Sequence, residues 1–487
     1  MRRALFWWVA AGALLLAGVM VLVGSTADVS RAATVAGSTP VRVFTPAAPG
    51  PGPVVVLAHG FSGSAAMMDP MASALSRAGL VVVAPHLPGH GGNATPLDEN
   101  ALDSAVTDAV GLASELADGG PVALVGHSMG AGAVTDRASR NPAASTVAIS
   151  LPDASALPQD PDRPANLLLL WGSAEPQRFV DAALTGLRLG YPEGEPGRTY
   201  GDSEAGDARR AQPIRGAEHI SVIYRQQTFD EVTAWLDSGS AEGSPRGDAR
   251  LLGVVLILGG GIVAARPLLA RADSDRGAEP PGASSGVVGR LGILAGAAVG
   301  AALGAAALQG VTDAVPVAVT GYLAGWFAVG ALFLWLATRR MGAAAGDADG
   351  LLWGAVAGVV LTLAMALPAR LSWAAYELVA VRWWVFLPLL VILGAWFWAE
   401  WRVVDGVRGW RRAVLLGTSR LVIVAVLLAG VVLLGAPGFL SLTVPLLLPI
   451  LLLLAVLAGW ARDPLAAAAA QAIPTALVAA TTFPIVP

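Results

Sequence analysis

Residues 121–130 read Pro-Val-Ala-Leu-Val-Gly-His-Ser-Met-Gly, and this segment is the most informative one in the chain. Residues 121–125 form an apolar run typical of a buried parallel strand, and residues 131–139 favour a helix. Between them, Gly126 to Gly130 fit the pattern G-x-S-x-G, which places Ser128 on a sharp turn from strand to helix. Glycine is favoured on both sides of this serine because the backbone there comes too close to its neighbours for a Cβ atom.

Similar apolar runs recur on both sides of this segment, between residues 41 and 237. They cover residues 53–58, 80–85, 121–125, 146–150 and 166–171, with helical stretches between them. Short apolar runs that are separated by helices are typical of a parallel sheet with helices on both faces. The sequence therefore predicts an α/β domain with a doubly wound, mostly parallel sheet over residues 41–237.

Four further motifs join G-H-S-M-G in a characteristic order. They are residues 59–63 (HGFSG), 85–91 (PHLPGHG), 172–175 (GSAE) and 216–219 (GAEH), and the first three of these follow predicted strands. With these motifs, about 200 residues of the chain resemble the α/β-hydrolase superfamily, in which the nucleophile, the acid and the histidine follow one another in that order.

The resemblance implies a catalytic triad. Ser128 would attack a carbonyl carbon, and His219 would take the serine proton and later protonate the leaving group. A carboxylate would hold the imidazole in the right tautomer, and the family's pattern implies Glu175 for this role. Asp153 and Asp181 remain the alternatives for the acid.

The same resemblance implies an oxyanion hole and an open site. The backbone N–H groups of Phe61 and Met129 would bind the oxyanion, a kind of contact worth about 3–4 kcal/mol in the transition state. Only residues 151–165 separate two predicted strands where family members usually carry a lid, so the chain resembles lidless esterases and dienelactone-hydrolase-like proteins. Residues 181–212 are interpreted as a longer insertion that shapes the pocket.

Several other kinds of site are excluded or disfavoured by composition. The chain has no cysteine and no lysine, so it has neither thiolate ligands nor the lysine of a phosphate-binding P-loop. His59, His86, His90 and His127 are predicted to be turn or packing residues, because no pair of them has metal-ligand spacing. No cofactor or metal is expected. A net charge of −4 without a basic run gives no reason to expect a nucleic-acid partner.

The rest of the chain has the composition of a membrane protein. Of all residues, 55% are hydrophobic and 14% are charged, against about a quarter charged in soluble proteins. Residues 1–24 are predicted to be a transmembrane helix or signal anchor, the alternative being a signal peptide that is cleaved near Ser25 or Ala27. Residues 25–40 and 238–250 are predicted linkers. Residues 251–487 are predicted to form an all-α bundle of about eight transmembrane helices, near 251–270, 291–311, 314–338, 351–369, 383–399, 413–434, 439–460 and 465–484.

The arginines of the short loops indicate an orientation for these helices. With a cytoplasmic N-terminus and nine spans, the outer short loops carry only Arg370 and Arg382. The inner segments carry twelve, namely Arg2, Arg3, Arg271, Arg276, Arg290, Arg339, Arg340, Arg402, Arg408, Arg411, Arg412 and Arg462. This places the hydrolase-like domain outside the cytoplasm, on the cell membrane. Acidic residues such as Glu400 are expected at the ends of spans, whereas Arg420 would require its span to start later than residue 413.

These observations predict a membrane-anchored, extracytoplasmic serine hydrolase that cleaves carboxylic esters, either small molecules or lipids. Its expected partners are the ester substrate and membrane lipids, and the sequence gives no oligomeric state. One alternative is a transport or sensing protein that uses the hydrolase-like domain as a binding module. Another is peptidase or acyl-transfer chemistry on the same triad.

Overall fold

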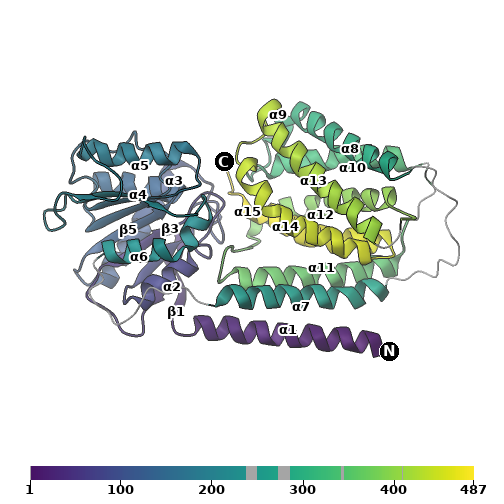
Figure 1. Ribbon diagram of the computed structural model, residues 1–487, viewed down its shortest axis with the longest axis horizontal. Coiled ribbons are helices and arrows are strands. Elements are labelled where there is room, and N and C mark those ends of the chain that lie inside the picture. The colour runs from purple at the N-terminus through teal and green to yellow at the C-terminus, as the bar shows by residue number, and fades with distance from the viewer. Residues whose placement is uncertain (1, 237–248, 272–285, 340, 342–344, 408–409) are drawn as a thin grey trace. The chain divides into compact units, whose positions relative to one another are not determined.

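The computed structural model describes residues 2–236, 249–271, 286–339, 341, 345–407 and 410–487. The chain divides into two compact units, which are described separately (Figure 1). The sheet unit comprises Met20–Gly253, Pro368–Glu377 and Pro484–Pro487, and the helical unit comprises Met1–Val19, Val254–Leu367 and Leu378–Phe483. The predicted linker over residues 238–250 lies outside the described residues except for its last two positions.

In the described part of the sheet unit, nine strands form one sheet in the order β1-β2-β4-β3-β5-β6-β7-β9-β8. The strands from β4 to β9 in this order pair in parallel, whereas β1, β2 and β8 pair in antiparallel fashion at the two edges. Every residue of β3 and β6 is buried, as expected for strands with both faces covered. The strands are β1 (Ser30–Ala36), β2 (Thr39–Thr45), β3 (Val54–Ala58), β4 (Val82–Pro85), β5 (Val122–His127), β6 (Ser145–Ile149), β7 (Leu167–Gly172), β8 (Thr199–Tyr200) and β9 (Arg209–Ile214).

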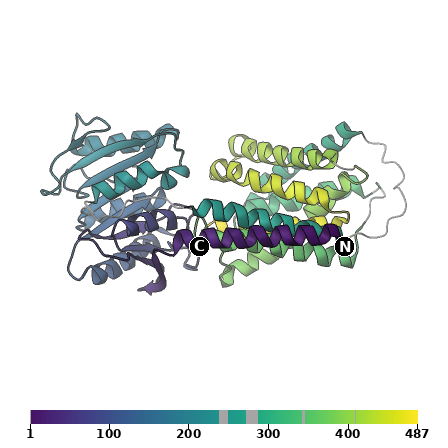
Figure 2. The ribbon, with the colours of Figure 1, turned by 60° about the horizontal axis from the view of Figure 1, so that its bottom comes forward.

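Helices cover both faces of this sheet (Figures 1 and 2). Helices α2 (Asp69–Arg77) and α6 (Gln226–Trp235) pack on one face, and α3 (Glu99–Ala117), α4 (Met129–Arg140) and α5 (Gln177–Gly190) pack on the other. Successive residues of β3 point to opposite faces, so Val55 and Leu57 join the first core and Val54 and Val56 join the second. The predicted α/β fold class is therefore confirmed. In the chain, the sheet unit is followed by a helical C-terminal region with several apolar helices.

One sequence-based interpretation of this unit was wrong. Residues 181–212 are not an insertion, because they contain most of α5, the edge strand β8 and the first residues of β9. Buried Arg209 joins these elements, since its guanidinium donates hydrogen bonds to the carbonyls of Gly186 (2.9 Å) and Arg163 (2.7 Å). These elements have no continuous apolar run in the sequence, because an edge strand is short and half exposed and can therefore be polar and glycine-rich.

Among the described residues, eight helices are long and apolar enough to cross a membrane. They are α1 (Arg2–Thr26, apolar from Leu5), α7 (Arg250–Arg271), α8 (Val287–Ala307), α10 (Thr320–Thr338), α11 (Ala348–Ala369), α12 (Ala380–Val403), α13 (Trp410–Leu433) and α15 (Pro464–Thr482). Helix α14 (Leu440–Trp460) contributes a shorter apolar stretch, Leu448–Trp460, and α9 (Gln309–Thr312) is a single turn. Each predicted span thus corresponds to a helix, although a membrane crossing itself remains a prediction.

A charged pair lies inside the helical unit. Glu400, in the last turn of α12, and Arg420, in the middle of α13, are both fully buried. Arg420 donates to both oxygens of Glu400 and to Gln471 Oε1 of α15, and Ser419 Oγ donates to Glu400 at 2.6 Å. A paired charge can be buried where a single charge cannot. Helix α13 can therefore begin at Trp410, and it need not start after Arg420.

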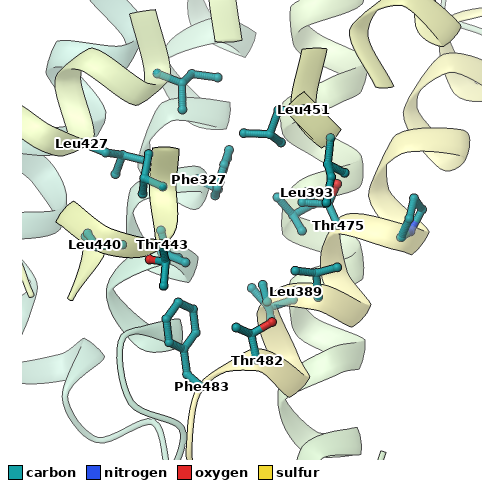
Figure 3. Close-up of a pocket in the computed structure, with 17 residues that line it drawn as sticks. Phe327, Leu389, Leu393, Leu427, Leu440, Thr443, Leu451, Thr475, Thr482 and Phe483 are labelled. Atoms are coloured by element: carbon teal, nitrogen blue, oxygen red, sulfur yellow. The ribbon is translucent and has the colours of Figure 1, made fainter. Parts of the chain in front are cut away.

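The helical unit also contains an apolar cavity of about 70 Å³ among α10 and α12 to α15 (Figure 3). Figure 3 shows Phe327, Leu389, Leu393 and Leu427 around it. None of the described residues that line it is charged, and the hydroxyl groups of Thr443 and Thr475 are hydrogen-bonded to carbonyls of their own helices. The lining of this cavity is therefore predominantly hydrocarbon.

Candidate active site

Ser128 occupies the turn between β5 and α4. Its backbone has φ 52° and ψ −117°, a conformation with positive φ that costs energy for a residue with a Cβ atom. A Cβ atom on Gly126 would lie 2.3 Å from the carbonyl oxygen of Gly130, and one on Gly130 would lie 2.5 Å from that of His59. The turn therefore requires both glycines of the motif, and it holds the serine at the carboxyl end of β5.

His219 reaches this serine from the loop after β9. Its Nε2 atom lies 3.0 Å from Ser128 Oγ, and its carbonyl oxygen accepts a hydrogen bond from His127 Nε2 at 2.9 Å. The ring stacks on Phe179 of α5, with ring centroids 4.3 Å apart and an interplanar angle of 26°. Phe179 thus fixes one face of the His219 ring, and His127 fixes the backbone of His219.

Glu175 completes this arrangement from the turn after β7. Its Oε1 atom lies 2.7 Å from His219 Nδ1 and accepts a hydrogen bond from Ser150 Oγ at 2.6 Å. Its Oε2 atom accepts from the backbone N–H of Gly172 at 3.0 Å. These hydrogen bonds hold the carboxylate in one orientation against the imidazole ring.

The two alternative acids lie elsewhere. Asp153 is exposed and accepts hydrogen bonds from the N–H and the hydroxyl group of Ser155. Asp181 is exposed on α5 and accepts from Gln177 Nε2 at 2.9 Å. The structure therefore brings Glu175, and neither aspartate, together with Ser128 and His219.

The two candidate oxyanion donors lie beside Ser128. Met129 follows the serine directly and opens α4, so its N–H belongs to the first turn of a helix, where anions are favoured. Phe61 lies in the loop after β3, and the adjacent Gly60 is so close that a Cβ atom there would lie 3.1 Å from Ser128 Cβ. His90 Nε2 accepts from the N–H of Ser62 at 3.0 Å, which fixes this loop.

Three of the other histidines are buried packing residues. Burial lowers the pKa of His59 to about 3, that of His127 to about 3 and that of His86 to about 4. His59 Nε2 accepts from the N–H of Leu87 at 3.1 Å, so its Nδ1 atom donates to the carbonyl of Gly60. This ring links the loops after β3 and β4. In the described part of the chain, no cluster of His, Asp and Glu residues could hold a metal ion.

Acid is expected to destabilise the sheet unit through these three rings. Their pKa values in the folded state are below the ordinary 6.5, so the unfolded chain binds protons first as the pH falls. Stability is therefore complete above about pH 6.5 and is lost from there toward pH 4. Each ring contributes about 1.4 kcal/mol per pH unit in this window, which gives about 4 kcal/mol for all three at pH 5.5.

Thermal unfolding of the full chain between pH 7.5 and pH 5 measures this loss. His86→Gln removes one ring and should reduce the pH dependence by about a third. The window lies above the range in which carboxylates titrate, so it isolates the histidines. A midpoint that stays constant between pH 7 and pH 5.5 would contradict the expectation.

Some residues around the site were not singled out from the sequence. Ser150 binds the acid, Phe179 supports the imidazole ring, and His127 binds the backbone of His219. Ser150 has positive φ at the carboxyl end of β6, next to the strand that carries Ser128. A polar residue directly after a predicted strand is the one signal that could have identified it.

One protein-family model matches part of the chain. Residues 55–286 match the model of the alpha/beta hydrolase family, a range that contains Ser128, Glu175 and His219. No curated protein matches the chain. The match supports the alpha/beta hydrolase fold of the sheet unit and a hydrolase activity.

Solved structures with a similar fold cover less than half of this chain. The protein TT1662 from Thermus thermophilus is 21% identical, with 43% of this chain and 98% of that chain covered and a TM-score of 0.31. An alpha-beta serine hydrolase homologue from Coxiella burnetii is 15% identical (42% and 95% covered, TM-score 0.33). A membrane phospholipase A, described as a bacterial virulence factor, is 16% identical (47% and 91% covered, TM-score 0.34). At these TM-scores no property of the three proteins is transferred to this chain.

Proposed function

We propose that this protein is a membrane-anchored serine hydrolase that cleaves carboxylic esters, with Ser128 as nucleophile, His219 as base and Glu175 as acid. The observation that carries the proposal is the continuous chain of hydrogen bonds from Ser128 Oγ through His219 to Glu175, with distances of 3.0 and 2.7 Å. A binding module would need none of these three groups, so this chain favours an enzyme over a sensing or transport protein.

The geometry supports a two-step reaction. Ser128 Oγ attacks the ester carbonyl while His219 Nε2 takes its proton, and the backbone N–H groups of Phe61 and Met129 bind the oxyanion. His219 then protonates the leaving alcohol, which leaves an acyl group on Ser128. In the second step His219 activates a water molecule, which releases the acid and restores the serine. Glu175 accepts the hydrogen bond from Nδ1–H throughout, so Nε2 is the atom that takes the proton from Ser128 or water and then donates it to the leaving group.

The apolar helices support the membrane anchor, and the arginine distribution supports an extracytoplasmic hydrolase domain. The buried pair of Glu400 and Arg420 is internally neutralised, and the cavity of the helical unit is lined by apolar residues. Neither feature offers a path for ions. We therefore assign the helical unit to anchoring rather than to transport.

One experiment tests both the chemistry and the orientation. Intact cells are treated with a membrane-impermeant fluorophosphonate, which reacts covalently with an activated serine. Wild type should be labelled and Ser128→Ala should not, whereas Ser114→Ala, a serine on α3 bonded to its own helix, should label like wild type. Labelling that survives Ser128→Ala would refute the nucleophile, and labelling seen only after lysis would refute the orientation.

A further inference from the structure

A segment from between two apolar helices contacts the hydrolase domain. Residues Pro368–Glu377, here called the cap segment, connect α11 to α12 but belong to the sheet unit. They begin 149 residues after His219, the last of the three candidate catalytic residues, and lie outside the stretch that matches the family. Their contacts with the sheet unit show which part of it they cover.

The first contact is with the loop that carries Phe61. The backbone N–H of Ala375 donates a hydrogen bond to Ser64 Oγ at 3.2 Å, and Ser64 is 2% exposed. Ser64 follows Gly63, whose N–H bonds to the carbonyl of Gly60 at 3.0 Å within the same loop. The cap segment therefore holds the loop that would supply an oxyanion donor.

The second contact is with the loop after β4. The carboxylate of Glu377 lies against Gly92, where an added Cβ atom would be 2.5 Å from Glu377 Oε2. Arg370 pairs with Glu377 at 2.7 Å, and Arg42 donates to the carbonyl of Arg370 at 2.7 Å. The two charges of the cap segment thus compensate each other, and Glu377 lies against this loop. Both contacted loops follow parallel strands of the sheet, namely β3 and β4.

These contacts place the cap segment at the active-site edge of the sheet. Parallel strands end at the same edge, and Ser128 and Glu175 follow β5 and β7 at that edge. The connection from β6 to β7 is short, in line with the lidless site expected from the sequence. Its residues Leu151, Ala154 and Leu157 are buried in the core. No other described segment outside residues 20–253, except the C-terminal residues 484–487, belongs to this unit.

The side chains of the cap segment are suited to hydrocarbon. Leu371, Trp373 and Tyr376 are each partly exposed. Trp373 Nε1 donates to the hydroxyl oxygen of Tyr376 at 3.0 Å, so these polar atoms satisfy each other. The ring faces that remain are apolar, so a hydrocarbon chain that lies against them is removed from water.

We propose that the cap segment forms a wall of the substrate site and selects esters with a long hydrocarbon chain. This inference rests on the proposed ester hydrolysis at Ser128 and adds the substrate class and the residues that select it. The residues that select the substrate lie in the connection between two apolar helices, α11 and α12. The same part of the chain therefore belongs to the proposed anchor and determines which esters are cleaved. Such a segment takes the place of the lid that the connection from β6 to β7 lacks.

The test compares p-nitrophenyl acetate with p-nitrophenyl decanoate on the full chain. Trp373→Ala should lower kcat/KM for the decanoate by about tenfold or more and that for the acetate by less than about threefold. Trp384→Ala is the matched control, because Trp384 is an exposed tryptophan of α12 in the helical unit. Trp384→Ala should leave kcat/KM unchanged for both esters. Labelling of Ser128 by a small fluorophosphonate should be equal in all three proteins.

Equal losses on both esters, or no change on either, would overturn the selecting role of the cap segment. If Trp373→Ala is not labelled and so has not folded, Ala374→Leu tests the same surface by enlargement. It should reduce the decanoate reaction relative to the acetate reaction, and an unchanged ratio would overturn the proposal. A wild-type protein that is not labelled at all would instead refute the proposed function.

Discussion

Glu175→Gln is expected to lower kcat by about 10⁴-fold without unfolding the protein. Glutamine has nearly the same shape as glutamate, but it carries an N–H₂ group that can donate to His219 Nδ1. The imidazole would then hold its proton on Nε2, the atom that lies 3.0 Å from Ser128 Oγ. A ring in that tautomer cannot accept the serine proton. Steady-state kinetics with p-nitrophenyl acetate measures the loss.

The two other acids of the sequence provide the controls. Asp153→Asn and Asp181→Asn remove exposed carboxylates that are bonded to Ser155 and Gln177, so each should leave kcat within about threefold of wild type. A large loss in either aspartate variant, together with a small loss in Glu175→Gln, would show that Glu175 is not the acid of the triad. Circular dichroism of Glu175→Gln should match wild type, which separates a chemical loss from unfolding.

The core of the hydrolase domain was predictable because its signals are local. The apolar runs of β3 to β7 are short and bounded by turn residues, and the serine motif follows one of them directly. Glu175 could be selected by its place after a predicted strand, whereas His219 was selected by the order of motifs in the family that the chain resembles. The antiparallel strands β1 and β2 and the edge strand β8 were not predicted, because half-exposed strands have no continuous apolar run.

The cap segment could not be found in the same way. Residues 373–382 mix aromatic and charged residues, a composition that is also typical of segments at a membrane interface. In the structure, Trp373 to Glu377 belong to the sheet unit, whereas Arg382 lies buried in α12 and bonds to carbonyls at the end of the chain. Contacts such as that of Ala375 with Ser64 join residues 311 positions apart, and no local pattern encodes them.

The charged pair in the helical unit gives the same lesson. Arg420 seemed out of place within an apolar span, and Glu400 seemed to be a terminal residue. The two charges occur together because Arg420 of α13 forms an ion pair with Glu400 of α12, so that neither charge is buried alone. A single sequence shows where charges fall along a helix but not which helix lies beside it.

Asp69→Asn is expected to destabilise the sheet unit by about 3–5 kcal/mol. Asp69 is fully buried at the start of α2, and it binds Arg250 at 2.6 Å, Arg31 at 3.2 Å and Arg42 at 3.3 Å. Loss of the carboxylate would leave three guanidinium groups together without their common counter-charge. Desolvation makes such unpaired charges costly. Urea unfolding at pH 7.5, followed by fluorophosphonate labelling of the folded fraction, measures the change.

The matched control is Asp28→Asn. Asp28 pairs with Arg77 at 2.6 Å, but its side chain is 53% exposed, so this pair should contribute at most about 1 kcal/mol. If Asp69→Asn costs no more than Asp28→Asn, the three arginines do not depend on Asp69. The comparison uses the same substitution at both sites, and the two aspartates differ mainly in burial.

The position of Asp69 extends its effect from stability to specificity. Two of its arginines also bind the cap segment, since Arg42 donates to the carbonyl of Arg370 and Arg250 to that of Leu371. The arginines come from β2 and from the first residue of α7, so one carboxylate orders chain segments on both sides of the hydrolase motifs. At a temperature where Asp69→Asn is still folded, the ratio of decanoate to acetate hydrolysis should fall, as in Trp373→Ala. A destabilised variant with an unchanged ratio would show that the cap segment keeps its place without Asp69, and that Ser64 and Gly92 suffice to hold it.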